Sequence, residues 1–208
     1  MTNAAPVLAP KRGRKYDQVL EGARRVFMRD GFDGANVDDI AAEANVSKAT
    51  LYSYFPDKKI LFIEVAKAES KRQADEAEAL VTLTAPPACV LPVAARRIID
   101  FFLSDFGRAT FRICVAEAER FPGLGQEFYD SGPGLIRERL ATYLNGAVER
   151  QELVIDDIYL AADQFAELCK ANIFPCVCFG IKLDYSEADR ARVANGAVST
   201  FMARYGVK

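Results

Sequence analysis

Residues 37–61 read VDDIAAEANVSKATLYSYFPDKKIL, and this stretch decides how the N-terminal part of the chain folds. Its first apolar side chains recur at the three- and four-residue spacing of one helical face, at Val37, Ile40, Ala41 and Ala44. Asn36 precedes this run, and its side-chain oxygen can cap a helix by accepting a backbone N–H. Asn45 follows the run, and asparagine tolerates the left-handed conformation that ends a helix. The pattern predicts a short helix followed by a tight turn.

A second short helix is predicted over residues 48–54, directly after that turn. Ser47 is its expected N-cap, Leu51 and Phe55 form its buried side, and Pro56 ends it. Two short helices around a tight turn have helix-turn-helix geometry, in which the second helix enters the major groove of DNA. The remaining sides of this helix carry an ammonium, hydroxyls and phenols, which suit contact with nucleic acid.

We expect the DNA contacts to come from these helices, their caps and the basic residues before them. The candidates are Arg14, Lys15, Asn36, Ser47, Lys48, Ala49, Thr50, Tyr52, Ser53, Tyr54 and Lys58. Lys58 is expected to hold a phosphate, because helix N-termini bind anions. Residues 1–15, with Lys11 and Arg12 beside the two basic candidates, are expected to be a flexible arm that reaches phosphates or the minor groove. The alternative for this arm is a solubilising tail.

The stretch GFDGANVDDIAAEANVSKATLYSYFPDKKILF, residues 31–62, resembles the DNA-binding domain of the TetR family of bacterial one-component transcription regulators. The matching elements are the GF pair at Gly31–Phe32, DIA at Asp39–Ala41, VSKATLY at Val46–Tyr52 and F-x-x-K at Phe55–Lys58. Asn45, Ala49 and Tyr54 depart from the Gly, Gly and His that the family often has there. The departure at Tyr54 leaves the DNA sequence preference open.

Residues 111–134, FRICVAEAERFPGLGQEFYDSGPG, resemble the ligand-binding half of TetR regulators of the AcrR/AefR-like type. This second resemblance is less specific, because that half varies widely within the family. Together the two resemblances cover nearly the whole chain. They imply an N-terminal DNA-binding domain followed by a helical domain that binds a small-molecule effector and a second copy of the chain.

Composition limits the classes of protein to consider. The chain has 208 residues, of which 50% are hydrophobic and 27% charged, as in ordinary soluble globular proteins. No apolar run is long enough to span a membrane, and five cysteines without a spaced framework fit a cytoplasmic protein. Residues 1–60 hold 10 Lys and Arg against 8 Asp and Glu, so DNA affinity would depend on where cations lie. The absence of histidine argues against a metal site, and no cofactor is expected.

Periodicity and helix-ending residues predict helices through the rest of the chain. They cover residues 16–29, 57–83, 90–107, 111–121, 124–130, 135–150, 156–179 and 187–205. Pro175 is expected to kink one of them, and Ser186 to cap the last. The predicted fold is all-α, with about nine helices. The predicted domains are a basic arm (1–15), a helix-turn-helix domain (16–60) and an effector-binding and dimerisation domain (61–208).

Two clusters in the C-terminal part suggest binding surfaces. Its aromatic rings and thiols predict an apolar effector pocket between helices, with ordinary core packing as the alternative. The pocket candidates are Phe102, Phe106, Phe111, Cys114, Phe128, Phe165 and Cys169. Small and apolar residues at helical spacing predict a seam between two subunits, with a monomer core as the alternative. The seam candidates are Phe165, Ala194, Ala197, Val198, Phe201 and Met202.

We therefore expect a ligand-responsive transcription regulator that binds a palindromic double-stranded operator as a homodimer, with a repressor favoured over an activator. The effector is expected to be apolar or aromatic. One alternative is an all-α enzyme, against which stands the lack of a histidine, a phosphate-binding glycine loop and a metal-ligand set. The other is a structural or protein-binding dimer. Cys176 and Cys178 could form a thiol sensor, but structural burial is the commoner fate of cysteine.

Overall fold

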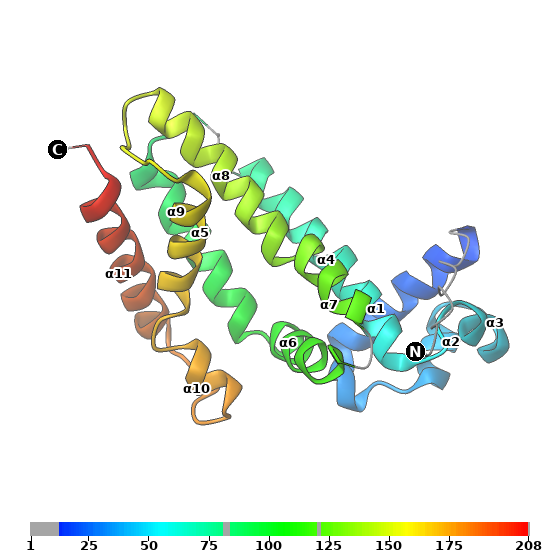
Figure 1. Ribbon diagram of the computed structural model, residues 1–208. Helices are drawn as coiled ribbons and strands as arrows, with labels where there is room; N and C mark the ends of the chain where they lie inside the picture. Colours follow the sequence, from blue (N-terminus) through cyan, green and yellow to red (C-terminus); the bar gives the residue numbers. More distant parts are fainter. Residues whose placement is uncertain (1–12, 81–83, 120–121, 208) are drawn as a thin grey trace, which may run out of the picture. The chain divides into compact units, whose positions relative to one another are not determined.

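The computed structural model describes residues 13–80, 84–119 and 122–207, and all regular secondary structure within them is helical (Figure 1). The helices are α1 (Arg14–Gly34), α2 (Val37–Glu43), α3 (Lys48–Tyr54), α4 (Lys58–Leu80), α5 (Pro87–Leu103), α6 (Asp105–Glu117), α7 (Pro122–Ser131), α8 (Pro133–Glu149), α9 (Ile158–Lys170), α10 (Phe174–Cys178) and α11 (Glu187–Tyr205). A single antiparallel bridge joins Leu153 and Gly206 in the described part of the chain. The all-α prediction is confirmed. None of the described helices combines the length and apolarity that crossing a membrane requires.

The chain divides after Val65 into two compact units, so the boundary falls within α4. The first unit holds α1, α2, α3 and the beginning of α4, and its core is made of fully buried side chains from each of them. They include Val19, Val26, Phe27, Ile40, Leu51, Phe55, Leu61 and Phe62. Helix α1 continues regularly to Gly31, whose φ of 71° breaks it. Phe32 then packs against the rings of Phe27 and Phe62, at centroid distances of 6.1 and 5.1 Å.

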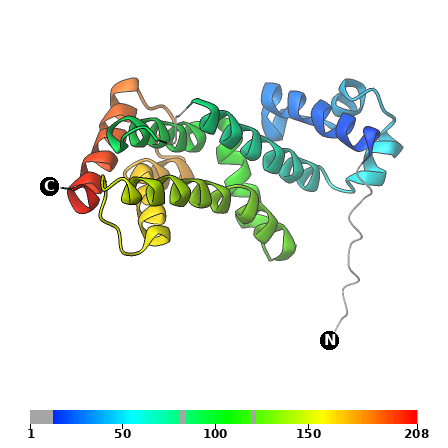
Figure 2. The same cartoon turned by 90° about the horizontal axis from the view of Figure 1, so that it is seen from above.

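The second unit is a helical bundle in which α5, α8, α9 and α11 surround one apolar core (Figure 2). Leu91, Ile99, Leu144, Phe165 and Phe201 are its largest fully buried members. Hydrogen bonds between polar side chains also connect these helices. Arg190 of α11 donates to Asp100 of α5 at 3.1 Å, and the phenol of Tyr205 donates to Gln164 of α9 at 2.5 Å.

The predicted helix boundaries are right where a capping side chain marks them. Asn36 accepts a hydrogen bond from the N–H of Asp39, and Ser47 accepts one from Thr50. Asn45 has the expected left-handed conformation, with a φ of 52°. Ser186 begins α11 as part of a reciprocal capping box with Asp189. These local signals placed the helix-turn-helix and the last helix correctly.

Two predicted helices are wrong, because each is interrupted where the apolar pattern continues, and Pro175, expected to kink the second, lies at the start of the separate helix α10. The helix predicted over residues 90–107 ends at Leu103, and Ser104 caps a new helix by accepting from Gly107 N–H at 3.0 Å. The helix predicted over 156–179 ends at Lys170, and α10 follows as a separate short helix. Asn172, with a φ of 62°, lies in this break.

Candidate nucleic-acid interface

Helix α3 exposes polar side chains to solvent, while its buried side fixes the helix in the core of the first unit. Leu51 is 1% exposed and anchors the helix in the core of the first unit, as does Phe55 at its C-terminal end. The candidates that face solvent are Ser47, Lys48, Ala49, Tyr52 and Ser53. Tyr52 is 47% exposed, a high value for an aromatic side chain that has no role in the core. The outer side of α3 can therefore meet a groove floor with a phenol, a hydroxyl and an ammonium.

Lys48 is the cation best placed to leave its present partner for DNA. Its ammonium lies 2.5 Å from the carboxylate of Asp38, and the two side chains are 53% and 68% exposed. Exposed ion pairs of this kind contribute about 0–1 kcal/mol, because water screens them. A DNA phosphate can therefore replace Asp38 at little cost.

The hydroxyl and amide candidates beside Lys48 hold the helix ends in place. Asn36 accepts from Asp39 N–H at 2.8 Å, and its amide donates to the Asp39 carboxylate at 2.6 Å. Ser47 caps α3 and lies 2.9 Å from the hydroxyl of half-buried Thr50. Ser53 donates to the carbonyl of Thr50 at 2.6 Å. In the free protein these groups fix the geometry of the turn and of α3.

Tyr54 lies at the end of α3. It is half-buried and not fully exposed, because its ring packs on other aromatic rings. The Tyr16 ring of α1 meets it edge-on at 5.9 Å, and the Phe55 ring lies 6.4 Å away. Tyr16 is 4% exposed, and its hydroxyl donates to the carboxylate of Glu64 in α4 at 2.9 Å. Sequence analysis placed Tyr16 at the start of the first helix but did not identify this support, because it joins residues 48 positions apart.

Lys58 contacts backbone carbonyls of its own unit. Its ammonium donates to the backbone carbonyls of Phe32 and Ala35, at 2.9 and 2.8 Å. It also lies 4.4 Å from the centroid of the Phe32 ring. In the structure this group therefore binds the end of α1 and the residue after it, and the expected phosphate contact stays a prediction.

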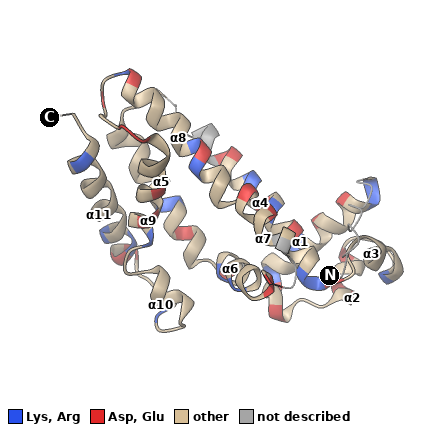
Figure 3. Ribbon diagram, viewed as in Figure 1, with Lys and Arg blue, Asp and Glu red and all other residues tan. Residues whose placement is uncertain are grey.

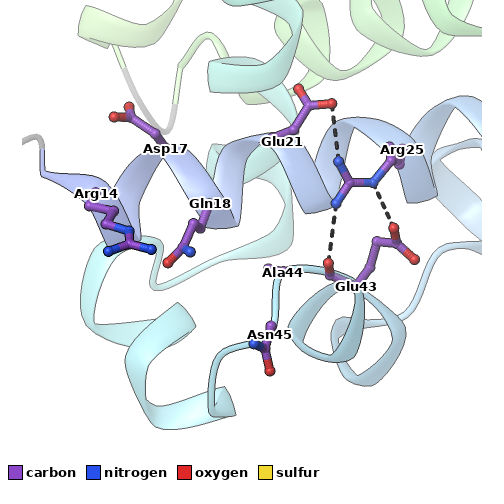
Figure 4. Close-up of a pocket in the computed structure, with 8 residues that line it drawn as sticks. All are labelled: Arg14, Asp17, Gln18, Glu21, Arg25, Glu43, Ala44 and Asn45. Carbon is purple, nitrogen blue, oxygen red and sulfur yellow. Dashed lines mark hydrogen bonds and ion pairs between the residues drawn. The ribbon is translucent and has the colours of Figure 1, made fainter.

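A surface groove of about 720 Å³ runs between α1 and the turn after α2 (Figure 4). Its lining residues are Arg14, Asp17, Gln18, Glu21, Arg25, Glu43, Ala44 and Asn45. Arg25 bridges the groove walls, donating to Glu43 Oε1 at 2.6 Å and to Glu21 Oε1 at 3.2 Å. Hydrogen bonds from Arg24 and the charges of both arginines keep the pKa of Glu21 below its ordinary value, so this wall stays negative at neutral pH.

Charges of both signs alternate over α1 to α3 (Figure 3). Among the expected basic contacts, Arg14 and Lys15 are exposed at the start of α1. Arg14 lines the groove, and Figure 4 shows its side chain beside that of Gln18. Lys11, Arg12 and the rest of residues 1–12 lie outside the described part of the chain. Because Arg25 is held by Glu21 and Glu43, Arg14 is the arginine of the groove that is better placed to meet a phosphate, with Asp17 as the acidic side chain nearest to it in sequence.

The structure separates the predicted pocket residues into two groups. Phe102 and Phe111 contact the same ring, Phe174, edge-on at 5.1 and 4.8 Å. The ammonium of Lys170 lies 5.5 Å from the Phe102 centroid and 5.3 Å from that of Phe174. Sequence analysis did not select Lys170. On α6, Phe106 and Cys114 belong to the buried face, and Phe128 is half-buried on α7.

The second group, Phe165 and Cys169, lies in the core of the bundle. Phe165 is 0% exposed and meets Phe201 edge-on at 5.3 Å, and half-buried Phe102 packs against the same core. Burial raises the pKa of the Cys114 and Cys169 thiols to about 12. Both thiols are therefore protonated at neutral pH, which suits an apolar environment.

The residues predicted for the subunit seam are mostly unavailable to a partner. Phe165, Ala194, Ala197 and Phe201 are 0–7% exposed within the single chain, and Val198 and Met202 are half-buried against the same core. For the four buried residues the structure contradicts the prediction, because helical periodicity identifies a buried face without showing which chain buries it, whereas for the half-buried Val198 and Met202 the seam stays a prediction. The opposite face of α11 is exposed and carries small side chains. They are Ala188, Asn195, Gly196, Ser199 and Ala203, and the exposed Arg192 lies among them on the same face.

Two family descriptions match this chain. Residues 19–65 match "Bacterial regulatory proteins, tetR family", and residues 89–207 match "AefR-like transcriptional repressor, C-terminal domain". The HTH-type transcriptional repressor AcnR of Corynebacterium diphtheriae is 34% identical over 61 residues, which is 29% of this chain and 32% of that protein. The biofilm operon icaADBC regulator IcaR of Staphylococcus aureus is 37% identical over 51 residues, 24% of this chain and 27% of that protein. The chain thus spans about a third of these curated relatives or less.

Solved structures match over almost the full length. A TetR-family transcriptional regulator from Mesorhizobium loti MAFF303099 has a TM-score of 0.79 at 28% identity, with 93% of this chain and 98% of that one covered. The flavonoid-responsive regulator FrrA has a TM-score of 0.66 at 32% identity, with 95% of this chain and 100% of that one covered. The similarity therefore extends through both compact units.

Proposed function

The chain belongs to the TetR family of bacterial regulatory proteins, and on that premise we propose that it is a sequence-specific DNA-binding repressor released by a small apolar or aromatic ligand. The observation that carries the proposal is the outer side of α3, where Lys48, Tyr52 and Ser53 face solvent on a helix anchored by Leu51. A rigid helix with donors and a phenol on its exposed side suits the major groove. Arg14 and Lys48 would supply phosphate contacts beside it.

A homodimer is part of this proposal, because one recognition helix reads few base pairs and regulators of this family act as dimers. The exposed face of α11 supports it. A methyl group built on Gly196 would meet nothing within 4 Å in the chain, so internal packing gives no reason for a glycine there. Glycine inside a helix costs about 1 kcal/mol relative to alanine. The close approach of a second helix backbone would account for it.

The segment before α11 supports the same partner. Phe179, Ile181 and Leu183 are 78%, 73% and 46% exposed, at alternating positions. Backbone hydrogen bonds from Gly180 to Val177 and from Ile181 to Cys176 fix this segment. A fixed, exposed apolar segment is typical of an interface. We refer to residues 179–183 and the exposed face of α11 as the outer surface, and we assign it to the second subunit.

For the effector, the ring cluster of Phe102, Phe111 and Phe174 is the best-supported contact region. Edge-on rings can receive a further aromatic ring in the same geometry. Lys170, whose ammonium pairs with the exposed Glu167, adds a cation at the edge of the cluster, and a ligand that replaced this carboxylate would be an aromatic one bearing a partial or full negative charge. The flavonoid-responsive regulator FrrA, 32% identical to this chain, gives the proposal its support from a relative.

The test of the function is footprinting on the DNA that flanks the protein's own gene. We expect protection of a palindromic segment, and release of that protection by a planar phenolic compound such as a flavonoid. Binding that shows no preference for the flanking DNA over mixed-sequence duplex would contradict the proposal. Specific binding that no aromatic compound releases would contradict only its effector half.

A further inference from the structure

We propose that the effector is an aromatic anion, which replaces the Glu167 carboxylate as the partner of Lys170. Its ring would lie against the ring cluster of Phe102, Phe111 and Phe174. This inference deepens the proposed function and rests on it. It makes Lys170 a residue that determines ligand specificity, and it makes Glu167 a competitor of the ligand within the chain itself.

The ring cluster keeps part of its surface open to solvent. Phe174 of α10 meets Phe102 of α5 and Phe111 of α6 edge-on, at centroid distances of 5.1 and 4.8 Å. All three side chains are half-buried, whereas Phe165, a ring of the bundle core, is 0% exposed. Phenylalanine is among the residues most often fully buried, so three adjacent half-buried rings mark a surface that an aromatic ligand can cover.

Lys170 holds a positive charge at the edge of these rings. Its ammonium lies 5.5 Å from the Phe102 centroid and 5.3 Å from that of Phe174, within the range of a cation–π contact. Lys170 is the last residue of α9, where the helix dipole favours a cation. Burial raises the pKa of the Cys178 thiol, and the charge of Lys170 opposes this rise, so its field extends to α10. A ligand that lies on the rings would meet this charge.

The present partner of the ammonium can be replaced. Glu167 and Lys170 form an ion pair within one turn of α9, and their side chains are 71% and 20% exposed. Exposed ion pairs contribute little to stability, because water screens the attraction. When the pair opens, the Glu167 carboxylate stays hydrated, whereas the less exposed ammonium is hydrated only in part. A carboxylate or phenolate oxygen of a ligand would pair with it again.

The two features together define the class of ligand. Glu167 is attached three residues before Lys170, so its effective concentration at the ammonium is high and a simple anion cannot compete with it. An aromatic anion adds contacts with the ring cluster that Glu167 cannot make. A neutral aromatic compound gains the ring contacts alone and leaves the ion pair in place.

The experiment compares two probes of one shape, 2-naphthoate and 2-naphthamide. The first is an anion near neutral pH and the second is neutral. Isothermal titration calorimetry measures their binding to the full-length protein without DNA. We expect the wild-type protein to bind naphthoate about tenfold more tightly, the order of one charge-assisted hydrogen bond. Acetate, an anion without a ring, should show no measurable binding.

Three variants assign the preference to the ion pair. In Lys170→Met the two probes should bind equally, with the affinity for naphthamide unchanged, and Lys170→Arg should retain the preference. In Glu167→Gln naphthoate should bind about twofold more tightly, because a competitor worth one exposed helical ion pair is removed. Lys71→Met is the control, since it removes an exposed ammonium of α4 outside the ring cluster, and it should bind both probes as the wild type does.

Four results would overturn the inference. They are equal affinity of the wild-type protein for the two probes, binding of neither probe, a preference for naphthoate that survives in Lys170→Met, and weaker binding of naphthoate to Glu167→Gln. The last result would show that Glu167 helps to hold the ligand and does not compete with it.

These outcomes are separate from the fate of the proposed function, because calorimetry needs no DNA. If the protein protects an operator that only neutral aromatic compounds release, the repressor function stands and this inference fails. If naphthoate is preferred as described but no specific DNA is bound, the ligand site stands and the repressor function fails.

Discussion

Gly22 lies where α1 closely approaches the C-terminal end of α2. A methyl group built on it would lie 2.7 Å from both Cβ and N of Ala44, so the residue at this position of α1 decides how near α2 can come. Because Ala44 directly precedes the turn, a shift here would be passed to α3. The groove lined by Arg25 and Glu43 lies beside the same contact.

Gly22→Ala should destabilise the protein by about 1–3 kcal/mol, because the added methyl overpacks a contact that has backbone on both sides. The measurement is urea unfolding followed by circular dichroism. Gly34→Ala is the matched control, since a methyl there would meet only Asp30 Cβ at 3.6 Å. Equal stability of the two variants would show that α1 and α2 do not approach as closely as described.

The cysteines predict a clear order of thiol reactivity. Cys89 is exposed, whereas burial raises the pKa of Cys114 and Cys169 to about 12, so neither buried thiol forms the reactive thiolate near neutral pH. With iodoacetamide at about pH 8.5, mass spectrometry should show Cys89 modified first and the buried pair only after unfolding.

The same burial gives a pH dependence. The ordinary thiol pKa of 9.0 applies to the unfolded chain, so both states are protonated below it. As the pH rises from 9.0 towards 12, the unfolded state loses these protons first, and stability should fall. Rapid modification of Cys114 or Cys169 in the folded protein would contradict this assignment.

Among the helices, the break between α5 and α6 depends on one side chain. Ser104 accepts from Gly107 N–H at 3.0 Å and donates to the Phe101 carbonyl at 2.7 Å. Ser104→Ala should therefore cost about 1 kcal/mol, and Ser104→Gly only a few tenths, because glycine still permits the cap conformation. Thermal unfolding of both variants checks this. A larger loss for Gly than for Ala would mean that backbone freedom, rather than the cap, controls the break.

The same element shows why part of the fold could not be predicted from the sequence. The helix-turn-helix and α11 were predicted within a residue or two, because Asn36, Ser47 and Ser186 mark their starts. Between Phe101 and Phe106 the apolar pattern continues across a real break, since α5 and α6 both bury side chains in the same unit. The 156–179 prediction failed similarly, at Asn172. Apolar periodicity indicates which residues are buried, and the pattern can continue unchanged where one helix ends and the next begins.

The residues of the candidate sites, too, could be predicted only where a local sequence pattern defines them. The α3 residues could be named from sequence because a recognition helix is defined by local spacing. The contact of Lys58 with the Phe32 carbonyl and that of Tyr16 with Glu64 join residues 26 and 48 positions apart, and no local pattern encodes them. Likewise, Phe165 fits the pattern of a pocket or a seam but belongs to the core.

At the scale of the whole molecule, the proposed outer surface can be tested by adding a charge. Ile181→Asp would bury a carboxylate in the subunit contact, at a cost of several kcal/mol, so sedimentation at micromolar concentration should shift from dimer to monomer. Val115→Asp is the control, because Val115 is also exposed, at 60%, but lies on α6 outside this surface. A wild-type monomer, or an Ile181→Asp dimer as tight as the control, would refute the assignment.

The exposed face of α11 has a consequence for the choice of the partner subunit. Small side chains such as Ala188, Gly196 and Ser199 accept many helices almost equally well, so on this face the exposed charge of Arg192 is what a foreign helix would have to accommodate. A cell that holds several related regulators would then face mixed dimers, each with two different recognition helices. In such a cell, the preference for an identical subunit over a paralogue would depend on the bulky side chains of Phe179, Ile181 and Leu183, because a partner must match their shapes. Exchanging this segment between paralogues should exchange their partners.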